Sequence, residues 1–392
     1  MATDLSRIDS VVSTLARDST YMTFEAIPSA LADGAERAGL HGVRLYLGDR
    51  QQRTLNEVTG DSRGAGLDGE RLRVDGTVAG LAFIQTRVVR VGWEPRFWVP
   101  IMNGSERLGV LYVHRADHLD EEPLYRLAAI AGLLVVDKRP SSDSYARLIR
   151  TRPMSVAAEM QWTLMPPNTF ATDRVTLSAT TEPAYDNAGD SFDYAVSGDI
   201  AHMALFDAMG HDNAAGLLAN LTVGAFRNER RRGTELSELP AGVEEILTED
   251  FVRSRFTTGI MAELDTASGE FRWVNCGHLP PVLLRKGDRV ITLECEPTHP
   301  LGMNFGVPVT VCHAQLQPGD RVLMHTDGVT EARDSRGEEF GIDRFVDFIV
   351  RHEADGLPVP ETLRRLVQAV LAHHDGQLED DATVLFCEWH GR

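Results

Sequence analysis

The pattern of apolar and polar positions in residues 1–136 predicts a mixed unit of helices and strands. Apolar residues recur at helical spacing near the start (Ile8, Val11, Val12 and Leu15), and "FEAIPSALADGAERAG" continues as a second helical stretch. Five later runs carry the β-branched and aromatic residues typical of strands: "GVRLYLGD", "RTLNEVTG", "RVVRV", "RFWVPIMNG" and "RLGVLYVHR", with "NGSE" as a hairpin turn. The apolar "DEEPLYRLAAIAGLLVVDK", which begins with acidic residues, predicts a closing helix. This order predicts an α/β sandwich typical of sensor domains.

Residues 137–168 have the composition of a linker that contains one helix. "KRPSSDS" favours a loop, and "PMSVAAEMQWTLMPP" begins with Pro, ends with Pro-Pro and places Met160 and Leu164 on one face. Such a helix either pairs across a dimer or serves as a plain spacer. In residues 169–392 the pattern changes to strands with short turns, interrupted by helical stretches near 212–230, 240–254 and 359–374.

Length and charge narrow the class of protein. A chain of 392 residues exceeds what one hydrophobic core usually serves, so we expect two domains. A composition of 43% hydrophobic and 25% charged residues is that of an ordinary globular protein. The net charge of −19 argues against a nucleic-acid binder, which would need a basic face.

The cysteines and the apolar runs bear on the compartment. Cys276, Cys295, Cys312 and Cys387 lack CxxC spacing, which favours reduced thiols over a disulfide framework or a zinc site. The N-terminus has charges throughout and no apolar core, and the longest apolar run, 127–136, is too short to cross a bilayer. We therefore expect a cytoplasmic protein that has no contact with a membrane.

Carboxylates stand at four strand ends in the second half of the chain. Asp is next to Gly or to another Asp in "NAGDSFDYAV", "LMHTDGVTEA" and "LEDDATVLF", and lies within three residues of Gly in "ALFDAMGHDNAAGLL"; each stretch is beside an apolar run. Any one of them fits a tight turn. Four carboxylates converging from different strands would instead form the oxygen-ligand cluster that Mg²⁺ or Mn²⁺ prefers. Two such ions would clamp a phosphoryl group and activate a water molecule.

These stretches resemble the SpoIIE-like branch of the metal-dependent protein phosphatases, the PPM family. The resemblance runs over roughly residues 157–389 in seven blocks: "AAEMQWTLMPP", "GDSFDY", "DAMGHDNAAGLL", "TTGIMAELDTASGEFRWVNCGHLPPVLLR", "HPLGM", "LQPGDRVLMHTDGVTEARDSRGEEFG" and "DDATVLF". It implies an α+β fold, an αββα sandwich of two antiparallel sheets flanked by helices, over residues 169–392.

The resemblance also implies the residues of a site with two Mn²⁺ or Mg²⁺ ions. Asp190 occupies the first acidic position, Asp207 is the expected bridging carboxylate, and Ala208 would supply a backbone carbonyl. Asp327 and Asp380 complete the expected cluster, which is both the catalytic and the metal site. Two neighbouring carboxylates are candidates for supporting these ligands: Asp193 and Asp381.

Other polar residues near these motifs have two interpretations. His211 is either a general acid for the leaving seryl oxygen or a residue that stabilises the start of the following helix. His278 in "GHLPP" is expected to shape a turn. Arg333 and Arg336 either face a phosphoprotein partner or belong to a solvated loop.

The first unit, residues 1–136, resembles the GAF family of sensor domains. The resemblance rests on "GTVAGLAFIQTRVVRV" and "FWVPIMNGSERLGVLYVHRADHLDEEPLYRLAAIAGLL". It implies a domain that binds a small molecule or a protein signal, and a possible homodimer.

Together the two resemblances imply a serine/threonine protein phosphatase under sensor control. Members of the SpoIIE-like branch typically act on a phosphorylated anti-sigma-factor antagonist, a STAS-type protein, in bacterial partner switching. Two alternatives stay open at this point. One is a sensor that sequesters a partner without turnover, and the other is a metal phosphoesterase that acts on small molecules.

Overall fold

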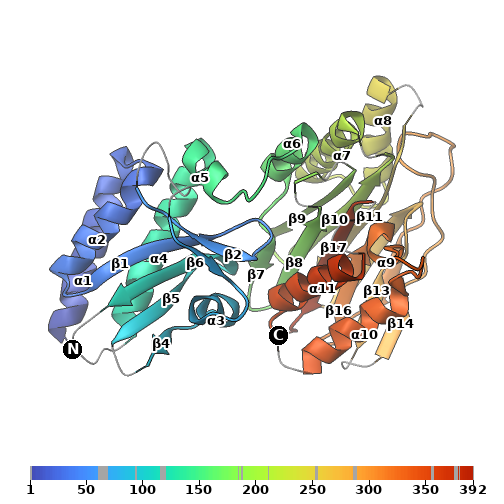
Figure 1. The fold of residues 1–392 in the computed structure, drawn as a ribbon. Coiled ribbons are helices and arrows are strands. Elements are labelled where there is room, and N and C mark those ends of the chain that lie inside the picture. Colours follow the sequence, from blue (N-terminus) through green and yellow to red (C-terminus); the bar gives the residue numbers. More distant parts are fainter. Residues whose placement is uncertain are drawn as a thin grey trace. The chain divides into compact units, whose positions relative to one another are not determined.

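The computed structural model divides the chain into two compact units, Met1–Pro153 and Met154–Arg392 (Figure 1). It describes residues 2–60, 69–92, 95–114, 121–183, 185–186, 189–210, 212–251, 255–285, 289–354, 357–374, 378 and 380–391. No helix in these ranges is both long and apolar enough to span a bilayer.

The first unit is built on one antiparallel sheet whose described strands run in the order β3-β2-β1-β6-β5-β4. Their bounds are β1 His41–Gly48, β2 Thr54–Glu57, β3 Arg71–Arg73, β4 Val89–Val91, β5 Arg96–Asn103 and β6 Glu106–His114. The hairpin predicted at "NGSE" joins β5 to β6. The α/β class predicted for this unit is confirmed.

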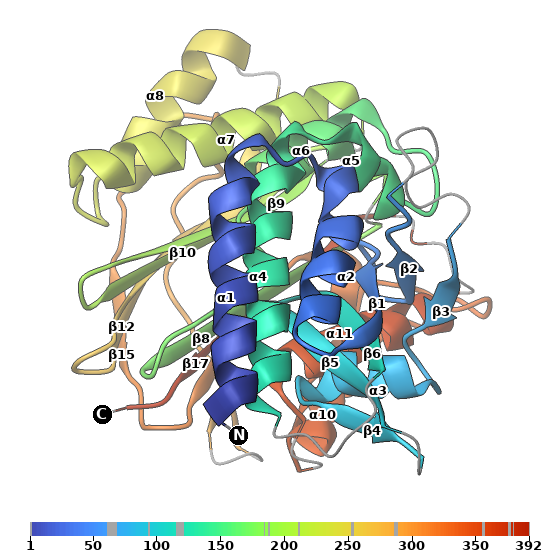
Figure 2. The ribbon, with the colours of Figure 1, turned by 90° about the vertical axis from the view of Figure 1, so that its left-hand side faces the viewer.

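Helices cover both faces of this sheet. One face carries α1 (Ala2–Asp18), α2 (Ile27–Arg37) and α4 (Glu122–Lys138), which share a buried apolar core with the strands (Figure 2). The other face carries α3 (Val78–Gln85), which the sequence pattern did not predict because its helical face is short and apolar all round. A 3₁₀ turn at Arg139–Ser141 and α5 (Asp143–Leu148) follow α4. They belong to the first unit, where the buried Asn56 donates to the Leu148 carbonyl over 2.9 Å.

The second unit contains two antiparallel sheets. The first has the order β15-β12-β11-β10-β9, and the second has the order β14-β13-β16-β17-β8-β7. The strands of the first are β9 Asp190–Ser197, β10 Ile200–Ala208, β11 Thr257–Asp265, β12 Glu270–Cys276 and β15 Cys312–Gln315. Those of the second are β7 Thr169–Ala171, β8 Val175–Glu182, β13 Val282–Arg285, β14 Arg289–Thr292, β16 Arg321–His325 and β17 Ala382–Trp389.

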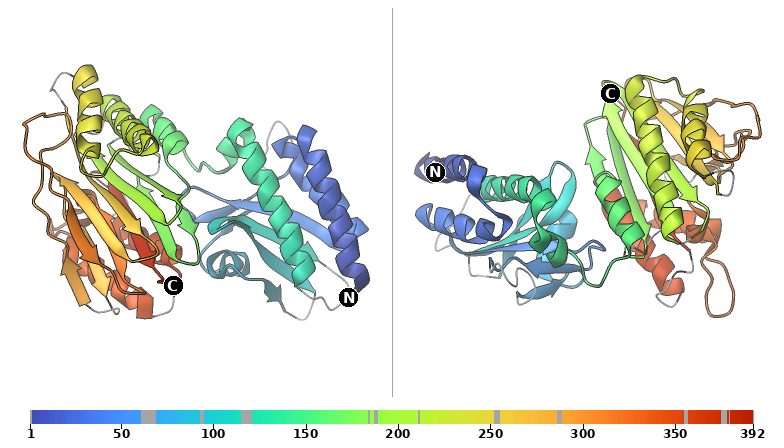
Figure 3. Two further views of the ribbon diagram at one scale, coloured as in Figure 1. Left: turned by 180° about the vertical axis from the view of Figure 1, so that it is seen from behind. Right: turned by 90° about the horizontal axis from the view of Figure 1, so that it is seen from above.

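The two sheets face each other across a core that includes Phe192, Leu205 and Leu385. The outer face of the first sheet is covered by α7 (Asn213–Arg232) and α8 (Leu239–Phe251), with α6 (Val156–Leu164) packed beside α7 (Figure 3). The outer face of the second is covered by α9 (Asp327–Thr330), α10 (Gly341–Ala354) and α11 (Val359–His373). The predicted αββα sandwich is confirmed, although α10 was not among the predicted helices.

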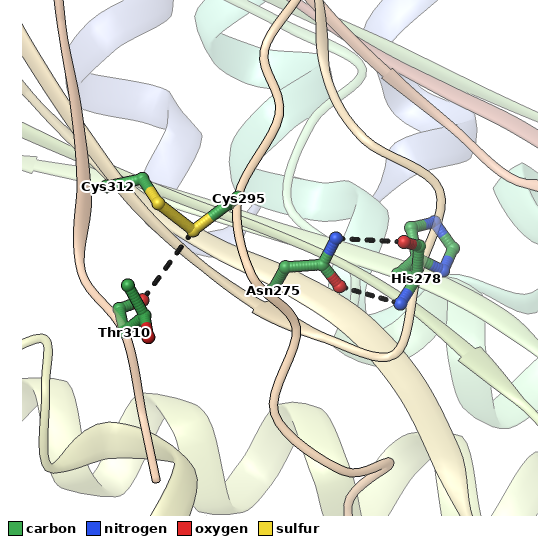
Figure 4. The surroundings of a disulfide bond; sticks show 5 residues. All are labelled: Asn275, His278, Cys295, Thr310 and Cys312. Carbon is green, nitrogen blue, oxygen red and sulfur yellow. Dashed lines mark hydrogen bonds between the residues drawn. A yellow bond between two sulfur atoms is a disulfide. The ribbon is translucent and has the colours of Figure 1, made fainter.

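One prediction about the cysteines is wrong. Cys295 and Cys312 form a disulfide bond, whereas Cys276 and Cys387 are free and buried (Figure 4). Seventeen positions separate the bonded pair, and the fold brings their Cα atoms to 5.8 Å, within the range that a disulfide spans. This pairing depends on how the chain returns along the edge strand β15, so local spacing gave no sign of it.

Candidate active site

Two of the predicted ligands face each other at one end of the first sheet. Asp190 opens β9 and Asp207 lies near the end of β10, and the two are direct partners in the antiparallel register. Asp190 is buried, whereas Asp207 is partly exposed. Like charges placed directly opposite on neighbouring strands destabilise a sheet. The fold therefore holds two carboxylates where they repel each other unless a proton or a cation intervenes.

The second sheet contributes carboxylates from two further segments. Strand β16 ends at His325, and Asp327 is the first residue of the one-turn helix α9. Asp380 and Asp381 directly precede β17; Asp380 is exposed and Asp381 is buried. The β9–β10 hairpin and two later segments of the chain thus bring their carboxylates to one end of the sandwich.

The pKa values of these carboxylates show that they influence one another. Burial and the neighbouring Asp327, Asp380 and Asp381 raise the pKa of Asp207 to about 7. Burial, with Asp207 and Asp381, raises the pKa of Asp190 well above its usual range. Burial and Asp380 raise the pKa of Asp327. Perturbed carboxylates gathered in this way are typical of a functional site.

Two polar side chains connect the sheets at this cluster. The fully buried Thr326 donates its hydroxyl to Oδ2 of Asp190 over 2.6 Å and accepts the Thr383 amide over 2.9 Å. Oδ2 of Asp381 accepts the amides of Gly189 over 2.7 Å and of Asp190 over 3.3 Å. Thr326 was not among the residues predicted from the sequence, although its place next to Asp327 was a usable signal.

Glycines allow the backbone to approach closely around the cluster. A Cβ at Gly189 would lie 2.6 Å from the Ala208 carbonyl oxygen, and a Cβ at Gly328 would lie 2.1 Å from the Asp381 carbonyl oxygen. The turn expected at Asp327–Gly328 is instead the start of α9. Gly328 is therefore needed for close packing against β17 and not for a turn.

The other candidates have different surroundings. Asp193 is buried and accepts hydrogen bonds from Arg227 and Arg230 of α7, so the structure directs it toward that helix. His211 lies outside the described residues. Arg333 pairs with Glu339, and Arg333 and Arg336 are exposed, as expected for a solvated loop.

His278 braces the turn after β12. Its Nδ1 lies 2.8 Å from the Thr258 hydroxyl, its Nε2 lies 3.1 Å from the His325 carbonyl, and Asn275 bonds its backbone (Figure 4). Burial and the neighbouring His325 lower the pKa of His278 to about 4. The neutral ring therefore ties this turn to the end of β16, two residues before Asp327.

The donors at this cluster suit a hard divalent cation. Carboxylate oxygens are ligands that Mg²⁺ and Mn²⁺ prefer, and so is a backbone carbonyl such as the one that the resemblance implies at Ala208. Across the described ranges, no three His, Cys, Asp or Glu side chains are arranged so that they could hold a metal ion as they stand. The raised pKa values nevertheless mark mutual repulsion that a divalent ion would relieve.

A comparison with known proteins assigns the family of this unit. Residues 197–390 match the family model described as stage II sporulation protein E (SpoIIE). These residues belong to the SpoIIE family. The match contains Asp207, Asp327 and Asp380, whereas Asp190 precedes it. The second unit is thus a SpoIIE-type phosphatase domain of the PPM class.

Individual relatives agree with this assignment. The chain is 22% identical over 239 residues to the phosphoserine phosphatase RsbU of Bacillus subtilis, covering 59% of this chain and 68% of that one. The SiaA-PP2C domain of Pseudomonas aeruginosa superposes with a TM-score of 0.50 at 16% identity, over 59% of this chain and 93% of that one, and shows the fold.

Proposed function

We propose that the chain is a Mn²⁺- or Mg²⁺-dependent serine/threonine protein phosphatase with two metal ions. The observation that carries the proposal is the convergence of Asp190, Asp207, Asp327 and Asp380 at one end of a SpoIIE-type sandwich, where burial and neighbouring carboxylates raise the pKa of the first three. The similarity to a phosphoserine phosphatase supports the reaction class. Ala208 would add a backbone carbonyl to this set.

The chain's own residues have defined parts in this mechanism. Asp207 pairs with Asp190 in the β9–β10 register, and Asp327, Asp380 and Asp381 act on its carboxylate. It would therefore hold divalent ions together with ligands from both sheets. Thr326 fixes the orientation of the Asp190 carboxylate, and Asp381 holds the backbone on either side of Gly189. Bound divalent ions would supply an activated water and neutralise charge on the phosphoryl group.

The cluster itself can be tested by removing single carboxylates. We expect Asp207→Asn and Asp327→Asn to lower Mn²⁺-dependent hydrolysis of a phosphoserine peptide and of nitrophenyl phosphate at least ~100-fold, because a lost ligand removes metal-derived catalysis. Asp199→Asn is the matched control, since Asp199 is exposed and lies at the β9–β10 hairpin. Undiminished turnover in either ligand variant would disprove the proposal.

The same proteins distinguish the alternatives. A protein that only sequesters its partner would bind it equally well after chelation with EDTA. A small-molecule phosphoesterase would hydrolyse nitrophenyl phosphate and leave phosphoproteins intact. We propose as substrate a phosphorylated anti-sigma-factor antagonist of the STAS type, and the Asp327→Asn variant, which would bind without turnover, is the reagent to capture it.

The first unit would act as the regulatory sensor, with a GAF-like domain as its architecture and a homodimer as a possible state. Tyr46, Trp98 and Tyr112 form a chain of ring contacts, 5.3 and 5.1 Å between centroids, on the sheet face that α3 covers. A small molecule entering here would have to displace these rings. A small-molecule or protein signal that binds elsewhere on the unit would leave these rings in place.

Helix α6 offers a route for regulation. Its Gln161 is buried and donates its side-chain amide to the backbone carbonyl of Asp190 over 3.1 Å. Arg227 of α7 bonds both the Leu164 carbonyl at the end of α6 and Asp193 of β9. A shift of α6 would therefore act on the proposed ligand Asp190 through the Gln161 hydrogen bond. It would also act on α7 through Arg227. Identical Mn²⁺ profiles for the full chain and for a chain starting at Met154 would remove this coupling.

A further inference from the structure

Arg255 lies two residues before β11 and contacts the chain where it leaves β10. Its Nη1 donates to the Met209 carbonyl over 3.2 Å. The Met209 amide in turn donates to the Phe256 carbonyl over 3.0 Å. Because Met209 directly follows Asp207 and Ala208, these bonds fix the backbone immediately after two of the proposed metal-binding residues.

The same guanidinium makes a two-point ion pair with Asp212. Nη1 lies 2.9 Å from Oδ1 and Nη2 lies 2.8 Å from Oδ2. Asp212 is also the N-cap of α7, where Oδ1 accepts the Ala215 amide over 2.9 Å. The Arg255 side chain is 27% exposed. Bidentate pairs of this kind are directional as well as strong, so one side chain joins Met209 to the start of α7.

The backbone at this point fits closely between Arg255 and the cluster. Gly210 has a φ of +99°, and a Cβ there would lie 3.2 Å from Nη1 of Arg255. On the other side, a Cβ at Gly189 would lie 2.6 Å from the Ala208 carbonyl oxygen and 2.9 Å from that of Gly210. The backbone from Ala208 to Gly210 thus has Gly189 on one side and the Arg255 guanidinium on the other, so a movement of the guanidinium would remove one of the contacts that hold it.

We propose that Arg255 is a positioning residue for the metal site, holding Asp207 and the Ala208 carbonyl in place through Met209 and Asp212. This role rests on the proposed function of the cluster. Arg255 contacts the backbone and the helix cap and none of the proposed ligand side chains. Its loss should therefore weaken metal binding while leaving the chemical step of the metal-saturated enzyme largely intact.

The first test measures Mn²⁺ binding to the full chain by titration calorimetry. We expect Arg255→Ala to raise the Kd for Mn²⁺ at least ~10-fold, the effect typical of residues that orient metal ligands, and Arg255→Lys to recover part of it. At saturating Mn²⁺, kcat on a phosphoserine peptide should stay within about threefold of the unsubstituted chain. The matched control is Arg174→Ala, which breaks the exposed Arg174–Asp199 pair (2.7 Å).

An unchanged Kd for Mn²⁺ in Arg255→Ala would overturn the proposal. If the KM for the phosphopeptide rose at the same time, Arg255 would be a substrate-binding residue instead. If the unsubstituted chain shows no Mn²⁺-dependent hydrolysis, the proposed function fails instead, and the calorimetric comparison still reports on Arg255.

A second variant separates the ion pair from the helix cap. Asp212→Asn keeps an N-cap acceptor and removes the charge, since Asn caps helices about as well as Asp. We expect it to weaken Mn²⁺ binding to a similar extent, and the double variant with Arg255→Ala to be no weaker than either single variant. Fully additive losses would show that the two residues act separately and would overturn the proposed route through Asp212.

Discussion

The hydroxyl of Thr326, the residue that directly follows β16 of the second sheet, donates over 2.6 Å to Oδ2 of Asp190, which opens β9 of the first sheet. The same hydroxyl accepts the amide of Thr383, so one buried atom connects three segments. The orientation of the Asp190 carboxylate thus depends on a residue that is adjacent to another proposed ligand, Asp327.

Replacing this hydroxyl should affect stability and metal binding together. Thr326→Val keeps the shape of the side chain and leaves the Thr383 amide buried without its acceptor, which costs about 1–3 kcal/mol of unfolding free energy. Thr326→Ser should keep most of the stability. Urea unfolding and the Mn²⁺ dependence of phosphopeptide hydrolysis measure the two effects. A Val variant as stable and as active as the Ser variant would contradict the role assigned to this hydroxyl.

Two glycine substitutions should have opposite effects on stability. Gly328→Ala would place a Cβ 2.1 Å from the Asp381 carbonyl oxygen, so we expect a loss of about 1–3 kcal/mol from forced backbone movement. Gly224 is exposed in the interior of α7, and a Cβ there would meet no atom within 4 Å. Gly224→Ala should therefore stabilise the protein by about 0.5–1 kcal/mol. Thermal unfolding of both variants checks the contrast, and equal shifts would contradict it.

The disulfide predicts a definite thiol count. Denatured, unreduced protein should show two reactive thiols, Cys276 and Cys387, and two more after reduction. Because the bond closes a loop with a sequence separation of 17 residues, reduction should cost about 3 kcal/mol of unfolding free energy in the chain-entropy account. Mass spectrometry after alkylation gives the count. Four thiols in unreduced protein kept free of reductant would show that the pair does not form.

The neutral His278 should make the protein sensitive to mild acid. Its pKa falls to about 4 in the folded chain, against about 6.5 when unfolded. Between these values the unfolded chain binds a proton that the folded chain does not, so the free energy of unfolding falls as the pH drops from 6.5 toward 4. Proton NMR of the imidazole would report the pKa directly. A titration near 6.5 in the folded protein would contradict the prediction.

The contribution of His278 can also be tested by measuring how the stability of two variants depends on pH. His278→Gln should remove the part of the pH dependence of urea unfolding that His278 contributes in this window, so the loss of stability between pH 6.5 and 4 should become smaller. His313→Gln is the control, since His313 is exposed and lies at the edge strand β15.

The fold of the second unit was readable from the sequence because its signals are local. Apolar runs next to Asp and Gly marked the strand ends, and the ordered blocks predicted the sandwich that the structure shows. The carboxylates Asp190, Asp207 and Asp327 were predicted as ligands from the resemblance, and in the structure each lies at or close to the end of a strand.

Features set by tertiary contact were not readable in this way. Thr326 stands next to Asp327, but its partner Asp190 lies 136 positions away, and the partner of Arg255, Asp212, lies 43 positions away. Helix α3 was not predicted because its apolar residues lie on all sides and give no periodic apolar face. The pair Cys295–Cys312 depends on the return of the chain along β15. The local sequence pattern predicts helices and strands, whereas side-chain contacts and the disulfide depend on which helices and strands lie side by side in the fold.

The bonds that Thr326 and Asp381 make at the cluster have a mechanical consequence. Both side chains reach from the second sheet to the first at Asp190 or Gly189, at the point where the carboxylates repel one another. An ion bound there would cross-link the two sheets. Without the ion, this end of the sandwich would open more often, so amide hydrogens of β9 and β17 would exchange faster in the metal-free protein than in the metal-bound protein.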